Sequence, residues 1–207
     1  MAGTLNLREI MKPTTVASPR LKARIAGILY LLIFIAAPTG ASTATPARMI
    51  IMLACDTGVA LLFYSLFKPV SRTLSMLAAI FRLILVAIMV VNSLNYFDVL
   101  NLFGAGHSSL AFNRGDEFSL VPFGIHCLLI GYLIFRSSFL PRILGALMMF
   151  AGLGWLTFLS PPLAHHLYPY VLAPGIFGEG ALTLWLIVMG LNEDRWREQA
   201  AGSRVMA

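Results

Sequence analysis

Residues 74–91 read LSMLAAIFRLILVAIMVV, a run of eighteen residues that contains a single charge, Arg82. At about 1.5 Å per residue, a helix of this length reaches about 27 Å, close to the thickness of the hydrocarbon core of a bilayer. The stretch therefore predicts a transmembrane helix. An arginine in the middle of such a helix is costly unless it has a partner.

Similar apolar stretches recur along the chain. Hydrophobic residues make up 58% of it and charged residues 12%, against about a quarter charged in a soluble domain, and the mean hydropathy is +0.83. The predicted fold is all-α, a polytopic six-helix bundle. Helices are expected at about 21–38, 47–67, 73–102, 119–136, 140–159 and 170–191. They form one membrane domain, residues 21–191, between a flexible segment, 1–20, and a tail, 192–207.

The basic residues give the predicted orientation. Twelve Lys and Arg residues fall on one side of the predicted spans and two, Arg48 and Arg114, on the other. The positive-inside rule places the larger group in the cytoplasm, so both termini are expected there. The twelve are Arg8, Lys12, Arg20, Lys22, Arg24, Lys68, Arg72, Arg136, Arg142, Arg195, Arg197 and Arg204.

The net charge of +6 indicates a membrane partner. The basic residues flank apolar stretches, so the expected partner is the lipid bilayer with its anionic headgroups, and no nucleic acid. No nucleotide or haem motif appears, and the adjacent His165 and His166 lack the spacing of a two-histidine metal site, so no cofactor and no metal are expected.

Four ionisable residues lie deep inside the predicted spans: Asp56, Arg82, His126 and Glu179. Asp56, His126 and Glu179 share one depth, and the long side chain of Arg82, near mid-bilayer, can reach it. None of the four is cheaply exposed to lipid, so they are expected to face one another. One arginine does not compensate two buried carboxylates. One acid is therefore expected to hold a proton, to share it with His126 or to face water. Asp56 is the easier partner for Arg82, which leaves Glu179, beside Gly178 and Gly180, as the protonated acid.

Several stretches resemble a bacterial family of membrane proteins of unknown function, number 4386. The resemblance covers most of the chain, implies a membrane fold and supplies no activity. Its motifs are Arg24-Ile-Ala-Gly-Ile-Leu-Tyr-Leu-Leu-Ile-Phe, Asp56, Phe81-Arg82, Gly124-Ile-His-Cys-Leu-Leu-Ile-Gly-Tyr-Leu, Phe139-Leu-Pro-Arg-Ile-Leu-Gly145, Gly178-Glu179 and Leu184-Trp185-Leu186.

Three hypotheses of function follow for a multi-pass protein of the bacterial cytoplasmic (inner) membrane. The first is an intramembrane enzyme of isomerase or cyclase type, in which Glu179, His126, Asp56 and Arg82 perform acid–base chemistry on a small lipophilic ligand. The second is a small transporter or proton-linked carrier. The third is a scaffold whose cluster fixes helix register, with a homodimer through small-residue faces as an option.

Overall fold

The computed structural model describes residues 18–37, 45–96, 115–167, 169–170 and 172–205. These residues form helices and no β-strand. The long helices are α2 (Pro19–Ala36), α3 (Pro46–Phe67), α4 (Arg72–Tyr96), α7 (Gly115–Arg136), α8 (Arg142–Leu156) and α10 (Leu172–Val188). A 3₁₀ turn, η2 (Thr157–Leu159), and a short helix, α9 (Pro161–Leu167), follow α8, and α11 (Glu193–Val205) follows α10.

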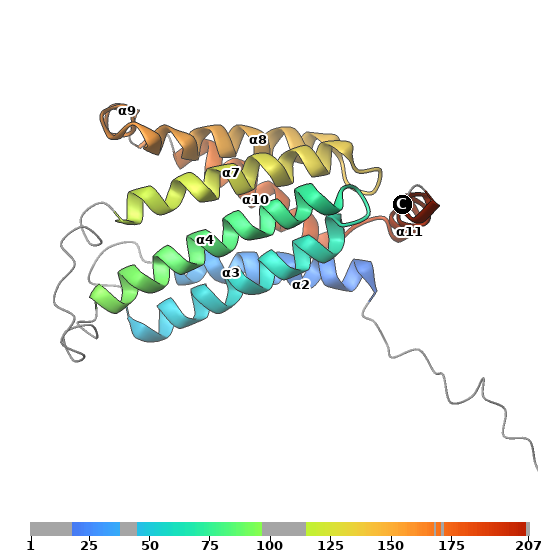
Figure 1. The fold of residues 1–207 in the computed structure, drawn as a ribbon, viewed down its shortest axis with the longest axis horizontal. Coiled ribbons are helices and arrows are strands. Elements are labelled where there is room, and N and C mark those ends of the chain that lie inside the picture. The colour runs from blue at the N-terminus through green and yellow to red at the C-terminus, as the bar shows by residue number, and fades with distance from the viewer. Residues whose placement is uncertain (1–17, 38–44, 97–114, 168, 171, 206–207) are drawn as a thin grey trace, which may run out of the picture.

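The long helices run side by side along the longest axis of the molecule (Figure 1). Each packs against its neighbour in the sequence, and α10 also packs against α2, so the helices form a closed ring. The short connections Lys68–Ser71 and Ser137–Pro141 lie at the same end as the start of α2 and as α11. We call this the α11 end of the bundle and the other the α9 end.

Two glycine pairs bring α7 and α8 into backbone contact. A Cβ atom added to Gly131 would lie 2.7 Å from the carbonyl oxygen of Gly145, and one added to Gly145 would lie 2.6 Å from that of Gly131. Gly124 and Gly152 form a second such pair, one heptad further along both helices. Small residues allow this approach in membranes, where dispersion forces between helices replace the hydrophobic effect.

Polar side chains cap the helix ends at both sides of the bundle. Ser18 and Thr45 accept hydrogen bonds from the first turns of α2 and α3, and each is followed by a proline, which suits the first helical position. At the α9 end, the guanidinium of Arg48 donates to the carbonyl oxygens of residues 35, 36 and 37. It therefore satisfies acceptors that the C-terminus of α2 would otherwise leave open.

A sharp bend separates α10 from α11. Gly190 has φ of 69°, a conformation that favours glycine, and the axes of the two helices differ by 103°. The indole of Trp196 in α11 donates to the carbonyl oxygen of Leu66 at 2.8 Å. The predicted tail is thus a helix that crosses the end of the bundle and is fastened to the end of α3.

Each of the six predicted spans coincides with one of the long helices, but length and composition single out fewer. Among the described residues, three helices are long and apolar enough to cross a membrane: α3, α4, and α8 together with its 3₁₀ turn. The number is four if the bent pair α10 and α11 is counted as one span. Helix α2 carries Arg20, Lys22 and Arg24 within its 18 residues, and the described side chains of α7 begin at Leu120. Residues 97–102, predicted to end the third helix, lie outside the described part.

Candidate functional site

Arg82 occupies the centre of the bundle and is 1% exposed. Its Nε and Nη2 donate to Oδ1 of Asp56 at 3.0 and 2.6 Å, so the ion pair links α3 to α4. Its Nη1 donates to the hydroxyl of Tyr30 in α2 at 3.0 Å. The guanidinium carbon also lies 4.6 Å from the centre of the Tyr30 ring and 5.3 Å from that of Phe123. Arg82 therefore has the paired, hydrogen-bonded surroundings that a buried charge requires.

His126 lies on α7, is 0% exposed, and its hydrogen bonds define its protonation state. Nδ1 lies 2.8 Å from the carbonyl oxygen of Ala78, which can only accept, so Nδ1 carries a hydrogen. Nε2 lies 3.1 Å from Nη1 of Arg82, which can only donate, so Nε2 is an acceptor. The ring is consequently neutral and holds the guanidinium in place. Phe63 and Phe123 lie nearly parallel to it, at interplanar angles of 4° and 11°.

Glu179 is joined to Arg82 through Tyr30. The Tyr30 hydroxyl, which accepts from Arg82, also lies close enough to the Glu179 carboxyl group to interact with it electrostatically. On its other side, Glu179 accepts a hydrogen bond of 2.7 Å from the indole nitrogen of Trp155 in α8. A polar cluster therefore extends from Asp56 through Arg82 and Tyr30 to Glu179 and Trp155, and its residues come from α2, α3, α4, α8 and α10.

Glycines on α10 shape the surroundings of Glu179. A Cβ at Gly175 would overlap the indole of Trp155, and one at Gly178 would lie 2.5 Å from the carbonyl oxygen of Leu147, so both allow α8 to approach α10 closely. Gly180, by contrast, has nothing within 4 Å of the position of a Cβ. Glu179 therefore sits between a tight helix contact and an open side of α10.

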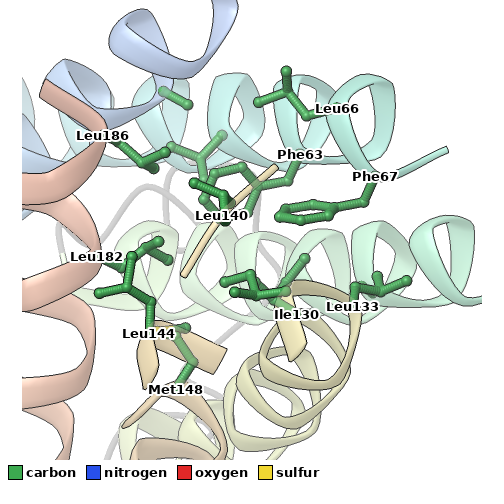
Figure 2. Packing of buried hydrophobic residues seen from close by; sticks show 14 of the residues in the cluster. Phe63, Leu66, Phe67, Ile130, Leu133, Leu140, Leu144, Met148, Leu182 and Leu186 are labelled. Atoms are coloured by element: carbon green, nitrogen blue, oxygen red, sulfur yellow. The ribbon is translucent and has the colours of Figure 1, made fainter. Parts of the chain in front are cut away.

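Toward the α11 end, an apolar layer closes off the cluster. Figure 2 shows Phe63 and Phe67 of α3 facing Leu182 and Leu186 of α10, with Leu140 between them. The void inside this layer has no space for a water molecule. The layer therefore separates the charged cluster from a cleft at the α11 end, which shares Phe139, Leu140 and Leu191 with it.

The structure brings all four predicted site residues into one network. Asp56 and Arg82 form the expected ion pair, whereas His126 contacts Arg82, and no hydrogen bond among the described residues joins it to Glu179. Sequence reasoning missed Tyr30 and Trp155. Each of these side chains carries a polar atom in an apolar helix, far from the start of that helix. Such an atom needs a hydrogen-bond partner in hydrocarbon, so the two residues could have been identified from the sequence.

Apolar helices that bury a cluster of charges between them define an integral membrane protein. More specifically, the chain belongs to the family described as a domain of unknown function (DUF4386), whose model matches residues 44–190. This range contains Asp56, Arg82, His126, Trp155 and Glu179, and Tyr30 lies before it. The resemblance seen in the sequence is therefore confirmed.

A relative from Archaeoglobus fulgidus, described as an uncharacterized protein, is 30% identical over 141 residues, which cover 68% of this chain and 80% of the relative. No solved structure matches the chain.

Proposed function

We propose that the chain is a multi-pass protein of the bacterial cytoplasmic (inner) membrane that crosses the bilayer six times with both ends inside. The charge bias supports this topology, because the α11 end carries Arg20, Lys22, Arg24, Lys68 and Arg72, as well as the basic residues of α11. The basic first turns of α2 then lie among headgroups, where long cationic side chains are well accommodated.

Within this topology, we propose an intramembrane enzyme that transfers a proton to and from a small lipophilic substrate. The observation that carries the proposal is the position of Glu179, which is bonded to Trp155 and lies close to the charged cluster on one side, and lies beside the open space at Gly180 on the other. A lipophilic molecule reaches such an acid sideways from the hydrocarbon. Glu179 is 5% exposed, whereas His126 is 0% exposed.

The charges of the cluster support a proton on Glu179. Asp56 receives two hydrogen bonds from Arg82 and neutralises it. Glu179 has no direct contact with a cation among the described residues, and its described partners are Tyr30 and Trp155. An isolated carboxylate in hydrocarbon is costly, so the neutral acid is the stable form of Glu179.

The reaction that fits this acid is the migration of a double bond, or a cyclisation, without any other reactant. The protonated carboxyl of Glu179 gives its proton to one alkene carbon, and the carboxylate so formed removes a proton from a neighbouring carbon. The acid is thereby regenerated and no electrons are gained or lost. Tyr30 and Trp155 position the carboxyl group.

In this proposal His126 takes no direct part in the acid–base chemistry that the sequence predicted for it together with Glu179, Asp56 and Arg82. Its Nε2 lone pair is used by Arg82, and a second proton on the ring would place two cations in contact. We therefore assign His126, Asp56 and Arg82 to positioning, with Glu179 as the catalytic residue.

The alternative of a carrier has less support from the structure. Alternating access requires a route for water or solute from the cluster to each face, and the layer of Phe63, Phe67, Leu140 and Leu182 lies across one of these routes. A scaffold needs the same ion pair but has no use for an acid beside an open surface. An experiment therefore has to distinguish the enzyme from a carrier and from a scaffold.

The test compares lipid extracts of cells that express the natural protein or Glu179→Gln at equal levels. Chromatography with mass spectrometry should reveal a lipophilic compound of unchanged mass and altered retention that accumulates only with the natural protein. Glu198→Gln, an exposed position on α11, is the matched control and should behave like the natural protein. Identical lipid extracts from all three strains, with normal protein levels, would contradict the proposal of an enzyme.

A further inference from the structure

A cleft of about 840 Å³ lies at the α11 end, where α10 turns into α11. This volume is within the range of small-molecule sites. The cleft is bounded by the start of α2, the connection between α7 and α8, and the bend at Gly190. It shares Phe139, Leu140 and Leu191 with the apolar layer but none of its lining residues with the charged cluster.

The wall of the cleft has an apolar part and a charged part. Trp185 and Met189 of α10 belong to the apolar part, and Arg20, Asp194 and Arg195 belong to the charged part. These three charged residues are exposed. With Arg197 and Glu193, which also line the cleft, they place three guanidinium groups and two carboxylates next to an apolar surface.

Two of the arginines remain available for a ligand. Arg20 forms no ion pair with any residue that the structure describes. The Arg195 guanidinium makes one long hydrogen bond, 3.4 Å, to the carbonyl oxygen of Ser138. Arg197 also lines the cleft, but it is engaged by Glu193 at 2.6 Å, so these two charges satisfy each other. Asp194 is the remaining acid.

We propose that this cleft binds the headgroup of one membrane phospholipid that carries a phosphodiester and a primary ammonium group. The forked guanidinium groups of Arg20 and Arg195 suit the phosphate oxygens, and the carboxylate of Asp194 suits the ammonium. Trp185 and Met189 supply the apolar surface for the glycerol and the first acyl carbons. Because the cleft lies at the end of the bundle, headgroups are present at its depth.

The perpendicular course of α11 supports this assignment. A helix that leaves the last span at 103° and is fastened through Trp196 to Leu66 runs along the surface of a membrane. The first turn of α11 then faces the headgroup layer. Asp194 also interacts favourably with the N-terminus of α11, but that role would confer no preference among lipids. The inference depends on the helices crossing a bilayer and is independent of any chemistry at Glu179.

Native mass spectrometry of the protein purified in detergent tests the proposal. Equimolar dioleoyl phosphatidylethanolamine, phosphatidylglycerol and phosphatidylcholine are added, and the lipid that remains bound is counted. The ethanolamine lipid should be retained preferentially. The double variant Arg20→Gln/Arg195→Gln should weaken its retention about tenfold or more, since two charge-assisted hydrogen-bonding groups are lost.

Asp194→Asn should remove the preference for the ethanolamine lipid over the glycerol lipid while binding of a phospholipid persists. Arg142→Gln is the matched control, because Arg142 is exposed at the same end and does not line the cleft. All the substituted residues are exposed, so melting temperatures in detergent should not change. Retention that is equal for the three lipids, or unchanged in the arginine variants, would overturn the proposal.

A competition experiment with soluble phosphates completes the test. Inorganic phosphate and glycerophosphoethanolamine are added as competitors, each without acyl chains. Neither should displace the lipid at equal concentration, because the apolar wall then contributes nothing. Displacement by either compound would show that the cleft binds a soluble phosphate, and the lipid assignment would be wrong.

Discussion

The hydroxyl of Tyr30 accepts a hydrogen bond from Arg82 at 3.0 Å and lies close to the Glu179 carboxyl group, so one oxygen stands between the ion pair and the second acid. The link is directional. Because the lone pair of Tyr30 receives the Arg82 N–H, its own proton can point at the Glu179 carboxyl group. A protonated Glu179 still offers a carbonyl oxygen to this proton, whereas a deprotonated Glu179 attracts it more strongly. Tyr30 is therefore the residue through which a change of charge at Glu179 reaches Arg82.

Modification by dicyclohexylcarbodiimide should distinguish the two acids. This apolar reagent reacts with protonated carboxyl groups, so we expect it to label Glu179 and to spare Asp56, which is ion-paired with Arg82. Trp155→Phe should raise the labelling rate several-fold, because the indole N–H that holds Oε1 is lost. Peptide mass spectrometry identifies the site, with Glu198, which is exposed on α11, as a control. Labelling at Asp56 in preference to Glu179 would contradict our assignment of the proton.

Loss of Arg82 should destabilise the protein more than neutralisation of Asp56. Arg82→Ala removes the partner of Asp56, Tyr30 and His126 together, and breaking a buried pair in this way costs about 3–5 kcal/mol. Asp56→Asn keeps an oxygen that can accept from Arg82, so its cost should be nearer about 1–3 kcal/mol. Melting temperatures in detergent give the ranking, and equal values for the two variants would contradict it.

The glycine contact between α7 and α8 predicts a large effect of one methyl group. Gly145→Ala would place a Cβ 2.6 Å from the carbonyl oxygen of Gly131, and the resulting displacement should cost about 1–3 kcal/mol. Gly180→Ala, with open space around it, should be neutral or stabilise by up to about 1 kcal/mol through helix propensity. Both variants are compared by melting in detergent. Similar loss at the two positions would indicate that general helix packing, rather than this contact, is responsible.

Topology can be tested with an impermeant thiol reagent on intact cells. The native Cys55 and Cys127 are buried, so single cysteines introduced elsewhere report their own location. Ser138→Cys at the α11 end should stay unmodified, whereas Ser160→Cys at the α9 end should react, since both positions are exposed. Ser71→Cys should behave like Ser138→Cys, and Ser108, which lies outside the described residues, should resemble Ser160. The reverse pattern would invert the orientation.

The apolar runs predicted the helical fold because a bilayer forces long hydrophobic stretches into helices. The depth of the ionisable residues in their helices also predicted that Asp56, Arg82, His126 and Glu179 would lie together. The sequence also favoured Asp56 over Glu179 as the partner of Arg82, which is the pair that the structure shows. It did not show that Tyr30 stands between Arg82 and Glu179, since this depends on the rotation of each helix. The sequence also did not predict the contacts between the paired glycines of α7 and α8, because spacing alone does not show which residue a small residue touches.

The ion pair of Asp56 and Arg82 joins helices that follow each other in the chain, with Lys68–Ser71 as their connection. During insertion, the two helices can enter the membrane as a hairpin in which each charge already has its counterion, so neither crosses hydrocarbon alone. Glu179 depends instead on Tyr30, near the beginning of the chain, and must await closure of the ring between α10 and α2. Biogenesis therefore has a natural order, in which the site acquires its last acid only after α10 has been synthesised and has packed against α2.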